Sequence, residues 1–479
     1  MENKRGTNLI NLCYFFLFGS VIFFLISLNQ VSLWGDELWT ISKIQFDYSQ
    51  LVKPGFLGDP NYPTKILFFK LISDIFQVNN TNFLVFSNLL NLIFLSFSLL
   101  ILKDHISKSQ LLIFISLIIS SEFFIRMFLE VGAYGFLLGL STLFSSCYAK
   151  LIFFRDHRIK IVFLTLLTGF VLSIWHPFAG LLVCSVFFTI LLGNIENIKK
   201  IIFALALFFP ILILITYSLD YTDGDQYFFV NLSFRHVRNT FAFMIPATLL
   251  LAAIIVLSIK EKHKTTTHFL YFSLPIIFSF FAFLLYSLFI QPIYQARYFI
   301  SLFPLFCFLL IVYEKKYIQK LSSLVPLICL LSVIFLYGPR SMLPYTNFQF
   351  LIQESHTLQC KDAPIFFNNT EHKVLNKNMQ DSYRVASKIY SDQFQRPIKD
   401  YSYVLSNITS LLKEFPGCSI FGLSGQKEQD VFIEDIVFIL KKNKENNITP
   451  SKIKAFQCEI PGCGILWTFK PNNDESNYN

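Results

Sequence analysis

Residues 268–290 read HFLYFSLPIIFSFFAFLLYSLFI, a run without a single Asp, Glu, Lys or Arg. A helix needs about 20 predominantly apolar residues to cross a hydrocarbon core about 30 Å thick. The run is therefore long enough and apolar enough to span a membrane, and it sets the pattern for the rest of the chain.

Comparable runs recur along the first two thirds of the sequence. In the whole chain 54% of the residues are hydrophobic and 15% are charged, which is too apolar for an ordinary soluble domain. We predict a mainly α, polytopic membrane protein with about 11 transmembrane helices, near residues 10–30, 82–102, 109–124, 131–154, 161–176, 178–193, 201–218, 240–259, 268–290, 298–313 and 321–337.

The loops on the two sides of the quoted run differ in charge, and this difference predicts the orientation. Lys260, Lys262 and Lys264 precede it, and short cytoplasmic loops collect such residues. Alternate loops along the chain are basic in the same way, and Lys4 and Arg5 precede the first span, which has no cleavage site and is read as a retained anchor. Most of the net charge of +9 is then explained by the basic cytoplasmic loops, and it gives no reason to expect nucleic-acid binding.

The chain is predicted to divide into a membrane domain, residues 1–340, and an extracytoplasmic tail, residues 341–479. The tail alternates strand-like runs (363–367, 418–423, 454–459 and 465–469) with helix-like runs (383–394 and 430–442), which predicts a C-terminal α/β domain. It shows no phosphate loop and no metal-ligand spacing. Its four cysteines, Cys360, Cys418, Cys458 and Cys463, would form two disulfides or remain free thiols.

The first outer loop carries the most informative segment, WGDELW at residues 34–39. A carboxylate held against aromatic neighbours has a raised pKa and can act as a general base on an acceptor hydroxyl or amine. Asp36 is the candidate base, with Glu37 beside it. The alternative is an interfacial loop in which the tryptophans lie at the headgroup level and the carboxylates are solvated.

The same loop continues through Asp59 into an amphipathic run from Thr64 to Phe76, which is predicted to lie in the interface as a helix. Asp59 is a candidate substrate contact or, alternatively, a cap of that helix. Lys65, near the start of the helix, is a candidate contact for a phosphate.

The second outer loop supplies Arg126, Glu130 and Tyr134. Arg126 and Glu130 are four residues apart, so they either pair with each other on one helix face or present the guanidinium to a phosphate. Tyr134 would add a hydroxyl donor.

Further outward turns carry His176 before Pro177 and the pair Arg297-Tyr298. His176 is a candidate ligand contact, with capping as the alternative. Arg297 is a second candidate for binding phosphate, with Tyr298 beside it, and interfacial snorkelling is the alternative. A mixed-charge loop at 219–239 is read as solvated or as part of an acceptor or phosphate site.

The ordered set of these outer motifs resembles the GT-C superfamily of membrane glycosyltransferases that use a lipid-phosphate sugar, such as protein O-mannosyltransferases and the lipid A aminoarabinose transferase. The resemblance covers about residues 10–310. One departure is Gly132, which stands where that family usually has an Arg two residues before the Tyr.

The resemblance implies an inverting transfer of a monosaccharide from a polyprenyl-phosphate donor to a glycolipid, glycan or protein acceptor. Asp36 would be the base, Glu37 would assist it or position the acceptor, and Arg126 and Arg297 would hold the donor phosphate. No protein-bound cofactor is implied with certainty, and a divalent metal ion stays open. The expected location is the inner membrane of a bacterium, with the site on the periplasmic face.

Two other classes of function share some of these features. A lipid-linked sugar transporter or flippase would place ionisable residues near the middle of its spans, whereas those of this chain cluster at one rim. A polymerase or ligase of the O-antigen type would use lipid-linked donors and a large outer loop, a role that residues 219–239 could fill.

Overall fold

The computed structural model describes residues 14–19, 22, 40–41, 43–52, 63–76, 82–127, 133–193, 195–220, 234–261, 267–289, 296–313, 324–336, 363–367, 391, 398–400, 407–415, 420–425, 441, 448–455 and 464–471. The chain forms two compact units. The first contains residues 1–29, 59–68 and 81–342, and the second contains residues 30–58, 69–80 and 343–479. The predicted division into 1–340 and 341–479 differs from this one because two short segments of the first outer region belong to the second unit.

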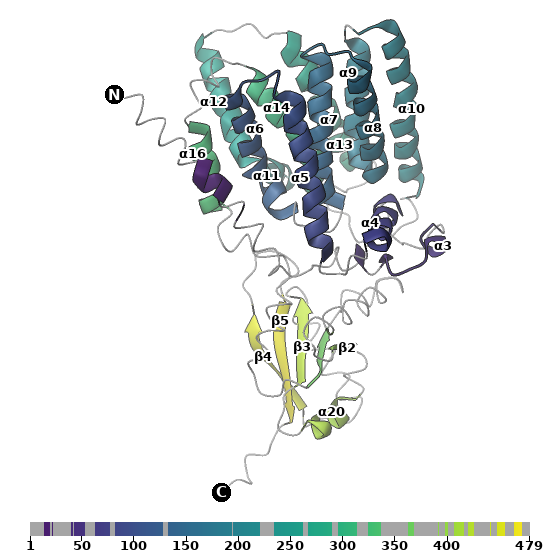
Figure 1. Ribbon diagram of the computed structural model, residues 1–479. Coiled ribbons are helices and arrows are strands. Elements are labelled where there is room, and N and C mark those ends of the chain that lie inside the picture. The colour runs from purple at the N-terminus through teal and green to yellow at the C-terminus, as the bar shows by residue number, and fades with distance from the viewer. Residues whose placement is uncertain are drawn as a thin grey trace. The chain divides into compact units, whose positions relative to one another are not determined.

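The first unit is a bundle of helices, which Figure 1 shows standing side by side. The chain has a mainly α-helical, polytopic membrane fold. Its elements are α5 (Asn82–Leu102), α6 (Lys108–Ile119), η2 (Phe123–Met127), α7 (Ala133–Ile152), α8 (Ile159–Trp175), α9 (Pro177–Leu192), α10 (Asn197–Asp220), α11 (Phe234–Phe243), α12 (Ile245–Glu261), α13 (Thr267–Phe289), η5 (Ala296–Ser301), α14 (Phe303–Tyr313), α16 (Leu324–Leu331) and η6 (Ser332–Leu336). Earlier in the chain, α3 (Tyr48–Leu51) belongs to the second unit, and α4 (Pro63–Phe76) belongs to the first unit as far as Phe68 and to the second beyond it.

Most of these helices coincide with predicted spans, but one span is not a single straight helix. The stretch predicted as 240–259 is divided between α11 and α12, whose segments Val237–Phe243 and Ile245–Ile254 are bent by 93°. Pro246 explains the break, because proline has no backbone N–H and its ring clashes with the carbonyl four residues earlier.

Length and composition identify fewer complete spans in the described residues than the eleven predicted from sequence. Among those residues two helices are long and apolar enough to cross a membrane, Tyr134–Ile152 and Asn197–Thr216, and the bent pair counts as a third if it is one span. Seven further apolar helices are 10–17 residues long. The total of about 11 spans stays a prediction.

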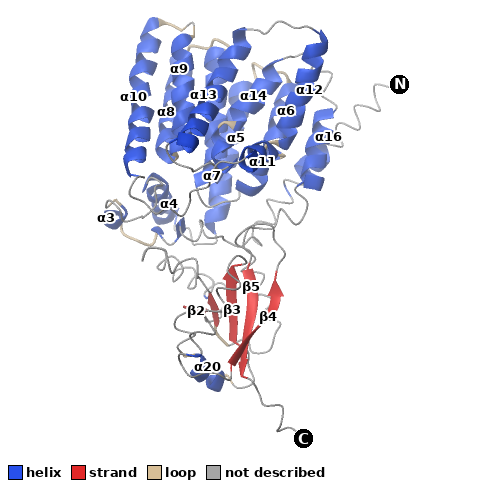
Figure 2. Cartoon of the chain, turned by 180° about the vertical axis from the view of Figure 1, so that it is seen from behind, coloured by secondary structure: helices blue, strands red, loops and turns tan. Residues whose placement is uncertain are grey.

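The central helix of the bundle is less apolar than a helix at its edge. All of the spanning stretch of α7 is buried, whereas 11% of the corresponding stretch of α10 is buried. Figures 1 and 2 agree that α10 lies at one edge of the bundle, with α12 and α16 at the other. In lipid, helices gain little from burying apolar side chains and associate through small residues and close packing. The glycine, serine and threonine content of α7 fits this central position.

One of these small residues fixes the distance between α5 and α7. A Cβ atom placed on Gly139 would lie 2.7 Å from Asn91 Oδ1 and 3.1 Å from Asn91 Cα. Both Gly139 and Asn91 lie inside helices, and the Asn91 side chain is completely buried. The two helices therefore approach so closely that only a glycine fits at position 139.

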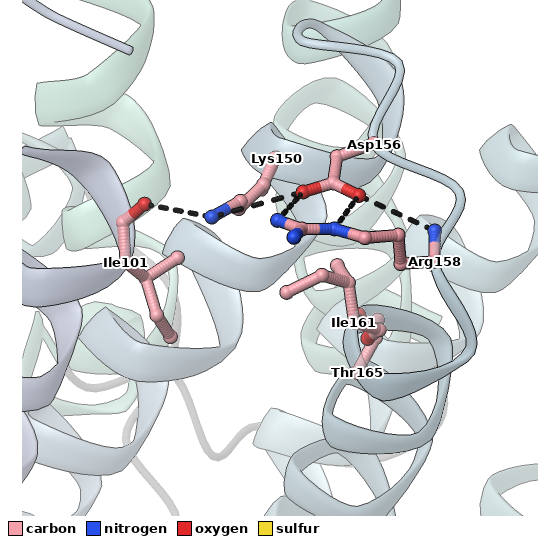
Figure 3. A network of polar contacts seen from close by, with 6 residues as sticks. All are labelled: Ile101, Lys150, Asp156, Arg158, Ile161 and Thr165. Atoms are coloured by element: carbon pink, nitrogen blue, oxygen red, sulfur yellow. Dashed lines mark hydrogen bonds and ion pairs between the residues drawn. The ribbon is translucent and has the colours of Figure 1, made fainter. Parts of the chain in front are cut away.

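A polar network ties three helices together at the end where α7 leads into α8 (Figure 3). The Asp156 carboxylate accepts two hydrogen bonds from the Arg158 guanidinium, at 2.8 and 2.7 Å, and lies 3.7 Å from Lys150 Nζ. Lys150 also donates to the carbonyl of Ile101 near the end of α5, at 3.3 Å. The hydrogen bonds from Arg158 hold the pKa of Asp156 at about 2, below its usual value of 3.8, so the carboxylate stays charged at neutral pH. Lys103 lies close to Ile101 in sequence, and Arg155 lies next to Asp156. Both belong to the basic loops, so the network lies at the end of the bundle that is predicted to be cytoplasmic.

The second unit contains a mixed five-stranded sheet with the order β2-β1-β3-β5-β4. Its strands are β1 (Ile365–Phe367), β2 (Ile398–Asp400), β3 (Ile420–Gly425), β4 (Ile448–Ala455) and β5 (Gly464–Pro471), and a helix, α20, spans Ile408–Glu414. β1 pairs in parallel with β2 and β3, while β5 pairs antiparallel with β3 and β4.

β1, β3 and β5 overlap predicted strand-like runs over most of their length, and β4 overlaps the run predicted at 454–459 at its last two residues. Residues 456–459 lie outside the described residues. Pro450 lies within β4 and interrupts the usual strand pattern, and β4 accommodates it because it is an edge strand. β2 and α20 were not predicted, and the predicted helices at 383–394 and 430–442 lie almost wholly outside the described residues.

The Gly139 contact leads to a stability prediction. We expect Gly139→Ala to destabilise the protein by about 1–3 kcal/mol, because the new methyl group overpacks the α5–α7 contact. The measurement is the thermal unfolding midpoint of the detergent-solubilised protein. Gly180→Ala is the matched control, since a Cβ atom there would meet its nearest neighbour at 3.7 Å, an ordinary contact. Equal midpoints for the two variants would contradict the proposed fit at Gly139.

Candidate functional site

Four segments that are distant in sequence bring polar side chains to one end of the helix bundle. α4 carries Lys65, the start of α7 carries Tyr134, the turn between α8 and α9 is His176, and η5 carries Arg297 and Tyr298. We call these five residues the rim cluster. The tyrosine and histidine rings form its centre, with the Tyr134 ring centroid 5.4 Å from that of His176 and 6.1 Å from that of Tyr298. The His176 and Tyr298 rings are 5.6 Å apart.

His176 joins α8 to α9 without any intervening loop. Its backbone is extended, with φ −153° and ψ 128°, because a residue before proline is excluded from the helical region. Its N–H donates to the carbonyl of Leu172 in α8, at 3.1 Å. Its side chain caps α9, since Nδ1 accepts a hydrogen bond from the Phe178 N–H at 3.3 Å. The capping role named as the alternative for His176 is therefore present in the structure.

This cap also fixes the tautomer of the imidazole. A backbone N–H can only donate, so Nδ1 must be unprotonated, and the proton of the neutral ring lies on Nε2. His176 is 3% exposed. Burial, and to a smaller extent the positive charges of Lys65 and Arg297, lower the pKa of His176 from 6.5 to about 3. At neutral pH His176 is thus an uncharged hydrogen-bond donor through Nε2.

Arg297 lies over aromatic rings. Its guanidinium carbon is 5.0 Å from the centroid of the Tyr134 ring and 5.9 Å from that of its neighbour Tyr298. Such cation–π contacts orient a guanidinium without neutralising its charge. A guanidinium is a planar set of donors, a geometry that matches a phosphate or carboxylate.

The helix that carries Lys65, α4, is held by aromatic contacts one turn further along. Phe68 lies three residues on, and its ring is 5.4 Å from Phe136 of α7 and 5.3 Å from Trp175 of α8. Trp175 and Phe136 in turn pack at 4.2 Å. The Lys65 side chain is 6% exposed, and its charge is near enough to His176 to lower the histidine pKa.

The rim cluster therefore combines two cations with a neutral imidazole donor and two phenols, beside a wall of aromatic rings. Cations and neutral N–H or O–H donors that converge where water is excluded stabilise an anion, such as the oxygens of a phosphate group. A buried neutral histidine suits this task because it donates a hydrogen bond without the cost of burying a third positive charge.

Sequence reasoning identified all five residues of the rim cluster as separate candidates, and the structure brings them together. Arg126 lies in η2, but its side chain is outside the described residues. The candidate base Asp36, its neighbour Glu37, and also Asp59 and Glu130 lie outside the described residues as well.

The structure also points to an acidic residue that sequence reasoning missed. Glu122 lies between α6 and η2 and is 8% exposed. It falls inside the span predicted at 109–124, where a lone carboxylate in an apolar run was itself a signal of function. In the described part of the chain no three His, Cys, Asp or Glu side chains are close enough together to hold a metal ion.

Comparison with known proteins adds a structural likeness. The sequence matches no model of a protein family and no curated protein. Two crystal structures of ArnT from Cupriavidus metallidurans resemble the chain. The apo structure has 9% sequence identity and a TM-score of 0.48, and the structure bound to undecaprenyl phosphate has 10% identity and a TM-score of 0.44. Each alignment covers 95% of this chain and 97% of ArnT.

The depressed pKa of His176 predicts how stability depends on pH. Between pH 6.5 and about 3 the unfolded chain binds a proton at this position and the folded chain does not. Stability should therefore fall as the pH decreases through this window, by up to about 1.4 kcal/mol per pH unit. His176→Asn retains an acceptor for the Phe178 N–H but has no titrating ring, so it should lose less stability than the wild type. Thermal midpoints of both proteins from pH 8 to pH 4 test this, and parallel curves would contradict it.

Proposed function

We propose that this protein is a membrane glycosyltransferase that moves a monosaccharide from a polyprenyl-phosphate donor to an envelope glycolipid, glycan or protein. The observation that carries the proposal is the rim cluster, in which Lys65, Arg297 and the neutral His176 converge from three parts of the chain. The proposed setting is the inner membrane of a bacterium, with the reaction on the periplasmic face and with a fold of the GT-C type.

The proposed reaction is a single displacement at the anomeric carbon of the sugar. An acceptor hydroxyl or amine attacks from the side opposite the phosphate, and a general base takes its proton. The bond between the anomeric carbon and the phosphate oxygen breaks, and the polyprenyl phosphate leaves with the electron pair. One displacement of this kind inverts the configuration of the sugar.

The residues of the rim cluster would act on the leaving phosphate. Negative charge on the phosphate increases as the bond to the sugar breaks, and groups that are already oriented toward that charge stabilise the transition state more than the ground state. Arg297, held over Tyr134, would offer its forked donors. Lys65 would add a second positive charge, and His176 would donate through Nε2.

The base in this proposal is Asp36, with Glu37 assisting or positioning the acceptor. Arg126, Glu130, Asp59 and Tyr298 are proposed as further contacts of donor or acceptor. These assignments come from the sequence pattern and from the resemblance of its motifs, and the rim cluster supports them by supplying the complementary half of the chemistry.

The proposed base gives one test. Asp36→Asn should abolish transfer, since base catalysis contributes about 10²–10⁴-fold to such reactions, while expression and membrane insertion remain intact. The measurement is a mass comparison of envelope glycolipids and glycoproteins in cells that carry the wild-type gene, the variant or no gene. Full product formation by the variant would remove Asp36 from the mechanism.

The rim cluster gives a second test, which does not require the sugar to be known. Arg297→Ala should weaken binding of undecaprenyl phosphate to the purified protein by about 10- to 100-fold, because a hydrogen bond to a charged group contributes about 1.5–3 kcal/mol. Lys108→Ala is the control, because it removes a cation at the start of α6 that is not part of the rim cluster. This variant should bind undecaprenyl phosphate as the wild type does. Equal affinity for all three proteins would exclude the rim cluster as the phosphate site.

A further inference from the structure

A cavity of about 500 Å³ lies at the edge of the bundle, between α8, α9 and α10. Its volume is within the range of roughly 300–1,000 Å³ that is usual for ligand sites. α8 contributes Phe163, Phe170 and Ser173, α9 contributes Phe187, and α10 contributes Phe209. All belong to the helical unit, and none is part of the rim cluster.

A proline and a glycine stand among the lining residues. Pro210 lies inside α10 and lines the cavity together with Ala206, whose carbonyl would be the acceptor for the N–H that proline lacks. At Gly169 a Cβ atom would lie 2.9 Å from the Phe187 ring, so α8 and α9 pack closely. The rings of Phe170 and Phe209 stack at 4.1 Å and join α8 to α10 in the wall of the cavity.

The lining can bind only hydrocarbon. The one polar side chain that lines it is that of Ser173, and its hydroxyl already donates to the carbonyl of Gly169 in its own helix, at 2.8 Å. A polar ligand would therefore lose its hydrogen bonds to water and gain none. An apolar chain would lose nothing.

The cavity is elongated along α8, which suits a long, narrow ligand. From Phe163 to Ser173 the cavity follows α8 for about 15 Å, which is half of a hydrocarbon core about 30 Å thick. Three lining side chains of α8, Phe163, Leu167 and Phe170, are 62%, 44% and 45% exposed, so the cavity opens outward along this helix. The lining ends at Ser173, one turn before His176, and includes no residue of the rim cluster.

Basic residues gather at the Phe163 end of the cavity. The helices that flank the cavity, α8 and α10, both start there, and the two loops before them lie together, since the pKa of Glu196 is lowered by Lys199 and, to a smaller extent, by His157. Asp156 and Glu196 are the acidic residues of these loops and first turns, and they are outnumbered by Arg155, Arg158, Lys160, Lys199 and Lys200.

We propose that the cavity holds one acyl chain of an anionic phospholipid from the cytoplasmic leaflet, with the lipid phosphate against the basic residues at the starts of α8 and α10. The chain would lie along α8 as far as Ser173 and so connect α10 to the rest of the bundle. Complementary charge at the Phe163 end favours an anionic lipid over a polyprenyl donor whose phosphate is bound at the rim cluster.

The experiment uses the full-length protein in phosphatidylcholine vesicles that contain a small fraction of phosphatidylglycerol with a photoactivatable diazirine in one acyl chain. Crosslinks mapped by mass spectrometry should fall on the lining residues of α8 and α10. Ala206→Phe fills the cavity with a phenyl ring and should reduce this labelling about tenfold. Ala204→Phe, on the same helix but outside the lining, is the matched control and should label as the wild type does.

Two further arms decide the identity of the ligand. A diazirine probe with a phosphatidylcholine head group should label the lining less than the anionic probe, and undecaprenyl phosphate in equimolar amount should not displace the anionic probe. Equal labelling of the Ala206→Phe variant would overturn the cavity as the chain site, and equal labelling by the two head groups would overturn the charge argument. Displacement by undecaprenyl phosphate would assign the cavity to the polyprenyl chain instead. None of these outcomes depends on transferase activity.

Discussion

The close approach of α5 to α7 is the constraint on which the helical unit depends. α7 is buried along its whole spanning length and contacts neighbours on all sides, so it fixes the positions of the helices around it. At Gly139 the backbone of α7 lies directly against Asn91, and no side chain larger than hydrogen fits between them. In a bilayer, apolar burial does not hold helices together as it does in water, and fit of this kind must supply the attraction.

The geometry of the rim cluster depends on this packing. Tyr134 stands in the first turn of α7, and Phe136, two residues further, contacts both Trp175 and Phe68. The same aromatic contacts therefore place α8, with His176 at its end, and α4, with Lys65. Arg297 and Tyr298 reach the cluster from η5, where a tight 3₁₀ turn rather than an α-helix precedes α14. Phe68, Phe136 and Trp175 thus help to place Lys65, while the Tyr134 ring of α7 lies against the guanidinium of Arg297.

Much of the helical unit could be predicted from sequence because long apolar runs bounded by polar residues mark the helices. The run 82–102 corresponds residue for residue to α5, and α8, α9 and α13 differ from their predicted spans by one or two residues at most ends. The bend between α11 and α12 could not be found from hydropathy, since both parts are apolar enough to read as one span, although Pro246 was a local signal. The strands of the second unit are short, and β2 has only three residues, too few for an alternating pattern to be recognised.

The candidate site shows a similar division. Sequence identified Lys65, Tyr134, His176, Arg297 and Tyr298 because polar residues at the ends of apolar spans are conspicuous. Their mutual distances depend on packing between helices and could not be derived from spacing along the chain. The cap from Phe178 to His176, which determines where the imidazole proton lies, likewise depends on backbone geometry that no residue pattern states.

The junction at His176 leaves no spare residue between two helices. It ends α8 and also caps α9, so a single residue fixes the rotation of one helix relative to the other. Inserting one residue there would rotate one helix by about 100° relative to the other. A surface loop of this chain can accept changes in length over evolution, but this junction cannot, and homologous chains should retain its length even where their sequences have diverged beyond recognition.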